Sequence, residues 1–108
     1  MEITLNEYQR LSERTIPVGT DKGLTNYALG LSGESGEVTD HIKKHVFHGH
    51  KLNEEEILGE LGDTLHYLTG LTSMIGYTLE EVATMNLEKL KKRYPKGFSQ
   101  EASINRND

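Results

Sequence analysis

Residues 24–76 decide the fold, and they read LTNYALGLSGESGEVTDHIKKHVFHGHKLNEEEILGELGDTLHYLTGLTSMIG. The nearest prolines are Pro17 and Pro95, so about 77 consecutive residues contain no obligatory helix breaker. No part of the chain shows the alternation of apolar and polar residues that a half-buried strand needs. The stretch therefore predicts long helices, and we expect an all-α fold.

Two long helices are predicted within this stretch. The first spans residues 24–47, because its apolar residues recur at intervals of three, four or seven and share one stripe. The second begins after Asn53, a favourable N-cap followed by three glutamates where the helix dipole favours acids, and Gly76 ends it. The apolar stripes consist of Leu24, Ala28, Leu31, Val38 and Ile42 on the first helix, and of Ile57, Leu61, Leu65, Leu68, Leu71 and Ile75 on the second.

Glycines interrupt the first long helix at Gly30, Gly33 and Gly36. Each costs up to about 1 kcal/mol of helix stability relative to alanine. They indicate close approach of another helix, access for a ligand, or simple tolerance of the cost.

Shorter helices flank the long pair. Thr4, followed three residues later by Glu7, predicts a capped helix over residues 5–14, and residues 15–22 read as a loop. Thr78 with Glu81 predicts a fourth helix in the same way. That helix carries basic residues in its last turn, and Pro95 and Gly97 end it.

Length and composition bound the function. The 108 residues (12.2 kDa) fit one domain, which we place at residues 1–98, with a polar, mobile tail at 99–108. The absence of cysteine excludes a disulfide scaffold, a thiolate zinc site and a cysteine nucleophile. With 17 acidic and 12 basic residues the net charge is -5, which argues against nucleic acid as a partner.

Location and assembly follow from the same numbers. No apolar run approaches the roughly 20 residues of a membrane span, and the N-terminus lacks a signal-peptide pattern. We therefore expect a cytoplasmic protein without a membrane partner. Only 34% of the residues are hydrophobic, and small domains bury only about 60% of their unfolded surface. A partner copy that completes the core is therefore expected.

Two pairs of carboxylates carry the chemistry. Glu34 and Glu37 lie three residues apart on the first long helix, and Glu60 and Asp63 repeat the spacing on the second, so each pair shares a face. Each pair lies on the same flank of its helix's apolar stripe. Because the connection between the helices is short, they should pack antiparallel, and the four carboxylates can converge.

Converging carboxylates repel each other and need cations or protons to coexist. All-oxygen ligand sets suit hard ions, so Mg²⁺ is the natural cofactor, with Mn²⁺ as an alternative. Mg²⁺ usually bridges to substrate phosphates. The competing interpretation is that these acids form solvated helix faces.

Three segments resemble the MazG-like nucleotide pyrophosphohydrolases, all-α enzymes whose signature is ExxE followed by ExxD. They are residues 28–38 (ALGLSGESGEV), continued by 40–44 (DHIKK), residues 60–68 (ELGDTLHYL) and residues 86–94 (NLEKLKKRY). The resemblance covers about residues 24–98. It implies a four-helix bundle with two long antiparallel helices, completed by oligomerisation.

The resemblance also implies an enzyme that cleaves a nucleoside triphosphate between its α and β phosphates in nucleotide-pool housecleaning. It implies a homodimer or homotetramer with active sites near subunit contacts. The implied Mg²⁺ ligands are Glu34, Glu37, Glu60 and Asp63, with Glu37 as the first choice of general base. Asn86, Lys89 and Arg93 would bind phosphates, and Lys44 and His48 are further candidates.

The chain departs from its relatives at two points. Some relatives carry an extra glutamate where this chain has Gly33, so the number of metal ions stays open. Relatives that prefer cytosine nucleotides use tryptophans near the base, and this chain has none. Tyr67 and Phe47 could stack on a base, but core or interface positions are the commoner use of such residues.

Other functions compete with this interpretation. His41, His45 and His48 share the acidic side of the first long helix and could bind a transition metal with Glu37. A di-iron bundle would need more carboxylates and histidines than the outer helices supply. A helical module that only dimerises is the non-enzymatic alternative, and the basic cluster at residues 89–96 is a weak candidate for nucleic acid.

Overall fold

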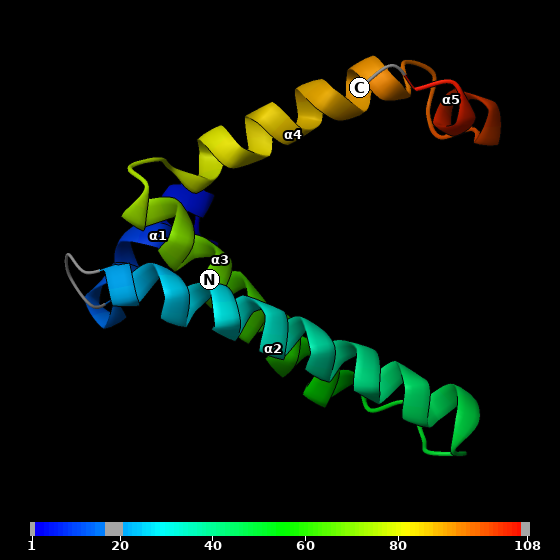
Figure 1. Ribbon diagram of the computed structural model, residues 1–108, viewed down its shortest axis with the longest axis horizontal. Helices are drawn as coiled ribbons and strands as arrows, with labels where there is room; N and C mark the ends of the chain where they lie inside the picture. Colours follow the sequence, from blue (N-terminus) through cyan, green and yellow to red (C-terminus); the bar gives the residue numbers. More distant parts are fainter. Residues whose placement is uncertain (1, 17–20, 107–108) are drawn as a thin grey trace.

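Helices make up almost all of the regular structure. The computed structural model describes residues 2–16 and 21–106 (Figure 1). The described residues contain no β-strand, which confirms the prediction of an all-α fold. The elements in chain order are α1 (Leu5–Ser12), the 3₁₀ turn η1 (Glu13–Thr15), α2 (Asp21–Phe47), α3 (Glu54–Met74), α4 (Leu79–Arg93) and α5 (Gln100–Ile104).

Local capping explains where three of the helices begin. The Thr4 hydroxyl accepts from the Glu7 backbone N–H at 3.0 Å, and the Asn53 side chain accepts from the Glu56 N–H at 3.1 Å. Thr78 and Glu81 form the predicted capping box at the start of α4. The predicted starts of α1, α3 and α4 are confirmed.

The predicted loop at residues 15–22 is wrong at both ends. Thr15 lies in η1, which continues α1, and α2 begins at Asp21. Residues 17–20, between them, lie outside the described residues. Gly23 lowers the helix propensity of this segment, but it is buried in the structure, so tertiary packing overrides the local preference.

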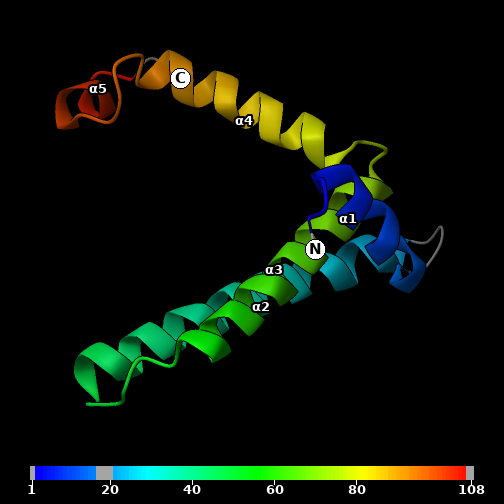
Figure 2. The same cartoon turned by 180° about the vertical axis from the view of Figure 1, so that it is seen from behind.

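Tyrosine–glycine contacts join α2 and α3, which pack as the predicted antiparallel pair (Figures 1 and 2). Tyr27 of α2 lies on Gly70 of α3, and Tyr67 of α3 lies on Gly30 of α2. A Cβ atom at either glycine would overlap the facing ring. The two rings also meet edge to face, with centroids 5.1 Å apart, which is a favourable geometry. Gly30 therefore serves close helix approach.

The apolar core of one chain is small. Among the described residues, Tyr27 and Leu79 are the buried apolar side chains, each 4% exposed. The predicted stripes lie only partly between α2 and α3: Leu31 and Val38 are half-buried, whereas other members are exposed. The expectation that the stripes form the seam is therefore wrong in part. The exposed members are Leu24, Ala28, Ile42, Leu61, Leu65 and Ile75.

A buried glutamine fastens α1 to the junction of α3 and α4. The Gln9 amide nitrogen donates to the Ser73 hydroxyl and to the Tyr77 carbonyl, each at 2.9 Å. Its oxygen accepts from the Leu79 N–H, the first of α4, at 2.8 Å. Side chains of α1 thus cap α4, because the first N–H groups of a helix have no partner within it.

The fourth helix leaves the α2–α3 pair soon after it begins. Its C-terminal end, orange in the figures, lies far from α2 and α3 (Figures 1 and 2). Beyond it, the Tyr94 and Phe98 rings pack together with centroids 5.3 Å apart. Ser99 then caps α5, which lies in the segment expected as a polar tail. In the part of the chain that the structure describes, no helix is long and apolar enough to cross a membrane.

Candidate metal centre

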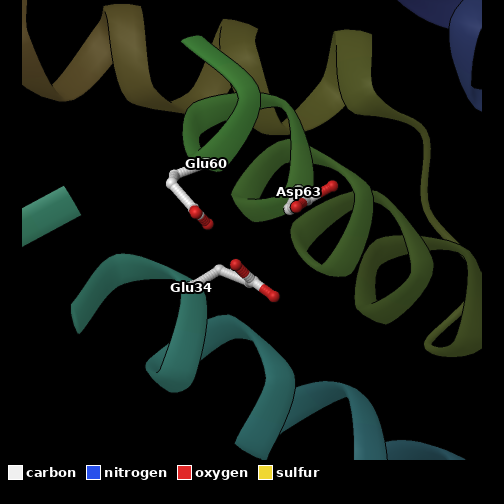
Figure 3. Close-up of side chains that lie close together, drawn as sticks. All are labelled: Glu34, Glu60 and Asp63. Carbon is white, nitrogen blue, oxygen red and sulfur yellow. The ribbon is translucent and has the colours of Figure 1, made fainter. Parts of the chain in front are cut away.

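Three carboxylates from two helices converge at the middle of the α2–α3 pair. Glu34 extends from α2, Glu60 extends from α3 toward it, and Asp63 lies beside Glu60 on α3 (Figure 3). One oxygen from each of the three lies within 4.8 Å of the others. The three-residue spacing places Glu60 and Asp63 on one face of α3, and the antiparallel packing brings Glu34 opposite them. The structure therefore brings together three of the four ligands proposed from the sequence.

The electrostatics of this cluster call for a proton or a cation. A hydrogen bond with Glu60 raises the pKa of the Glu34 carboxyl above its ordinary value, and partial burial and the neighbouring negative charges raise it further. Two carboxyl groups can share a hydrogen bond only when one of them holds a proton. A divalent ion can replace that proton, because it neutralises more charge and accepts several oxygen ligands. The donor set, three carboxylates and no nitrogen, suits a hard ion.

Glu37 borders the cluster from the next turn of α2. It is exposed, and its charge contributes to the raised pKa of Glu34. It lies outside the group of three oxygens that meet within 4.8 Å. Glu37 is thus an exposed carboxylate beside the cluster rather than a member of it.

His41 lies beside the cluster on α2. Its Nδ1 is 3.6 Å from Glu56, and its Nε2 is 3.9 Å from Glu60. The ring is therefore placed between two carboxylates of α3. The described residues give no histidine-containing group of three metal-ligating side chains, and His45 points Nδ1 at the His50 carbonyl 2.8 Å away.

The two further phosphate-binding candidates of α2 lie beyond the cluster. Lys44 forms an ion pair with Asp40 at 2.9 Å, which raises the pKa of Lys44 and lowers that of Asp40. Glu37 and Glu56 act on the Lys44 charge as well, so Lys44 faces the acidic side of the helix pair. His48 lies about 21 Å along the helix axis from Glu34, at the end of α2.

Asn86, Lys89 and Arg93, the candidates of the third motif, lie on α4. Asn86 and Lys89 are exposed, and Arg93 is half-buried. Because α4 diverges from α2 and α3, the structure does not bring these side chains to the carboxylates of the same chain (Figures 1 and 2).

Tyr8 is a neighbour of the site that the sequence did not reveal. Partial burial raises the pKa of the Tyr8 phenol, and the charge of Asp63 adds to the shift. In the sequence, Tyr8 reads as one apolar position of a short helix. Only the docking of α1, fixed by the adjacent Gln9, places it near Asp63.

Comparison with known proteins agrees with the motifs. The family model described as "MazG nucleotide pyrophosphohydrolase domain" matches residues 22–98. The chain is also 32% identical over 89 residues to the Gene 37 protein of Mycobacterium phage L5, covering 79% of this chain and 78% of the phage protein. No solved structure shows a significant match.

Proposed function

The chain belongs to the MazG nucleotide pyrophosphohydrolase family, and we propose that it hydrolyses a nucleoside triphosphate between its α and β phosphates. The products would be a nucleoside monophosphate and pyrophosphate. The observation that carries the proposal is the cluster of Glu34, Glu60 and Asp63, whose oxygens lie within 4.8 Å of one another on two facing helices. We further propose that the activity serves cytoplasmic nucleotide-pool housecleaning.

The proposed ligands of a divalent ion, Mg²⁺ or Mn²⁺, are these three carboxylates together with Glu37. A bound ion would neutralise phosphate charge and make water more acidic. The side chains fit this role because the pKa of Glu34 is raised by its hydrogen bond with Glu60, by partial burial and by the charges of the neighbouring carboxylates, and a cation can replace the shared proton.

Glu37 is the proposed general base. It is exposed at the edge of the cluster, so it can take a proton from the attacking water as the new phosphorus–oxygen bond forms. The bond between the attacked phosphorus and the oxygen that bridges the α and β phosphates breaks, and pyrophosphate leaves. His41 lies beside Glu60, with its Nε2 3.9 Å from a carboxylate oxygen, and Lys44 supplies positive charge near Glu37.

We propose that the working protein is a homodimer or homotetramer. The uncovered apolar side chains of α2, α3 and α4 support this, because surfaces of this kind mark association sites in soluble proteins.

Product identification tests the activity. Purified protein with Mg²⁺ is incubated with a panel of ribo- and deoxyribonucleoside triphosphates, and phosphorus NMR follows the products. We expect equal amounts of monophosphate and pyrophosphate, and loss of turnover by at least about a hundredfold in Asp63→Asn. Glu55→Gln, which removes the same charge outside the cluster, is the matched control. Release of orthophosphate, or a stable oligomer that turns over no substrate, would overturn the proposal, and the latter would favour a helical association module.

A further inference from the structure

The residues that face each other along α2 and α3 follow a single register (Figures 1 and 2). Tyr27 lies on Gly70 near one end of the pair, and His41 Nδ1 lies 3.6 Å from Glu56 toward the other. Between these contacts, steps of three and four residues along α2 match equal steps back along α3, which is the spacing of a packed helix seam. At this register the seam positions are Tyr27, Gly30, Glu34, Glu37 and His41 on α2, and Gly70, Tyr67, Asp63, Glu60 and Glu56 opposite them on α3.

The contact of Tyr67 with Gly30 lies directly beside the carboxylates. Gly30 is one turn before Glu34 on α2, and Tyr67 is one turn after Asp63 on α3. A Cβ atom at Gly30 would lie 2.6 Å from the Tyr67 Cζ. Carbon atoms in contact stay about 3.5–4.0 Å apart, so any side chain at this position would have to open the contact by about 1 Å.

Packing with two further rings holds the Tyr67 ring in place. Its centroid lies 5.1 Å from that of Tyr27 and 5.4 Å from that of His66, and the latter two rings are 5.6 Å apart. Tyr27 is buried and donates its hydroxyl to the Thr15 carbonyl at 3.1 Å. Because Tyr67 packs against an anchored ring, a larger residue at Gly30 would separate the helices rather than turn the ring aside.

We propose that Gly30 and Tyr67 are positioning residues of the metal centre, because their contact sets the distance across which its ligands meet. Those ligands extend from both sides of the seam, Glu34 from α2 and Glu60 with Asp63 from α3 (Figure 3). Neither positioning residue offers a ligand atom of its own, so each acts through the carboxylates. The inference rests on the metal site of the proposed function.

The ligand geometry of a small hard ion makes this distance critical. Mg²⁺ binds oxygens at about 2.0–2.1 Å in a near-octahedral shell, so two oxygens of one shell lie at most about 4.2 Å apart. The oxygens of Glu34, Glu60 and Asp63 already lie within 4.8 Å of one another. An additional separation of about 1 Å between the helices would therefore take Glu34 out of reach of an ion held by α3.

The affinity for Mn²⁺ alone, measured by electron paramagnetic resonance, tests this role without an activity assay. Gly30→Ala is compared with Gly70→Ala, whose new Cβ overlaps the Tyr27 ring in the same way but two turns beyond Asp63. We expect at least about a tenfold loss of affinity in Gly30→Ala and less than about a threefold change in Gly70→Ala. Equal losses in the two variants, or undiminished affinity in Gly30→Ala, would overturn the proposal.

A compensating variant keeps the test decisive if Gly30→Ala alone does not fold. In Gly30→Ala/Tyr67→Leu a smaller, flexible side chain replaces the ring that the new Cβ overlaps. We expect its Mn²⁺ affinity to return to within about threefold of the wild type, and a loss that persists in the folded double variant would overturn the proposal.

The wild type separates this inference from the proposed activity. Wild-type protein that binds Mn²⁺ and shows the expected ranking of variants, but turns over no triphosphate, would overturn the proposed function and leave the positioning role standing. Turnover without saturable Mn²⁺ binding would overturn the positioning role alone.

Discussion

Replacing Gln9 by methionine tests how the fold positions α4. Methionine keeps the length of the side chain but removes its polar atoms. Gln9 is 5% exposed and donates to the Ser73 hydroxyl and the Tyr77 carbonyl, each at 2.9 Å. It also accepts from the Leu79 N–H at 2.8 Å. The substitution thus removes three hydrogen bonds and leaves one buried N–H without a partner.

The loss can be worked out from these contacts. The two donated hydrogen bonds contribute about 1 kcal/mol each, and an unpaired buried N–H costs about 1–3 kcal/mol. The carbonyl of Tyr77 and the hydroxyl of Ser73 regain partners more easily, because Tyr77 is exposed and Ser73 also donates to Glu13 at 3.1 Å. Burial of the methionine side chain offsets about 1 kcal/mol of this loss of stability. We expect a net destabilisation of about 2–4 kcal/mol.

Urea unfolding followed by circular dichroism measures the change at one fixed protein concentration, since association contributes to stability. In thermal melts of a chain of this size, the expected fall in Tm is about 8–20 °C. Asn6→Ala is the matched control, because Asn6 caps the next N–H of α4, that of Glu80, from an exposed position. It should cost less than about 1 kcal/mol, since water replaces its bonds. Equal losses in the two variants would refute the reasoning that burial makes Gln9 decisive.

Three further predictions concern the helix pair and the carboxylates. Gly70→Ala should destabilise the protein by about 1–3 kcal/mol, because the new Cβ overlaps the Tyr27 ring, whereas Gly59→Ala, with open space around it, should stabilise by up to about 1 kcal/mol; thermal melts that rank the two alike would contradict the tyrosine–glycine contacts. Because the pKa of Glu34 is raised, this group contributes its full stability to the metal-free protein when the pH is below the ordinary pKa of 4.5. That stability is lost as the pH rises through the raised pKa. The Tm of Glu34→Gln should therefore exceed that of the wild type at pH 7.5, and the two values should converge toward pH 4.5. A difference in Tm that does not depend on pH would exclude this charge repulsion. Addition of Mn²⁺ should raise the wild-type Tm more at pH 7.5 than at pH 5, because protons compete for the same carboxylates, and EDTA should reverse the rise; an equal rise at both pH values would count against binding at the cluster.

Local patterns were enough to predict the helices and the acidic pairs. Thr4, Asn53 and Thr78 act within four residues of their partners, so the starts of three helices could be predicted from neighbouring residues. The spacing of Glu60 and Asp63 places them on one face by helix geometry alone. The short connection between the long helices gave the antiparallel pairing.

Long-range contacts could not be predicted in this way. The start of α2 at Asp21 was missed because Gly23 weakens the helix locally, while its burial depends on the rest of the fold. The contact of Tyr27 with Gly70 depends on the register between two helices, which the apolar stripes did not define. The direction of α4 depends on Gln9, whose amide reads in the sequence as an ordinary polar residue of a short helix.

A titration with Mn²⁺, followed by electron paramagnetic resonance, tests the central claim that the carboxylates of α2 and α3 form a metal site. The wild type is titrated with and without an α,β-imido nucleoside triphosphate, in which nitrogen replaces the oxygen between the α and β phosphates. Glu60→Gln and the exposed control Glu55→Gln are titrated alongside it. We expect saturable binding in the wild type and the control, and at least about a tenfold loss of affinity in Glu60→Gln. Undiminished binding by Glu60→Gln, or no saturable binding by the wild type with nucleotide present, would contradict it.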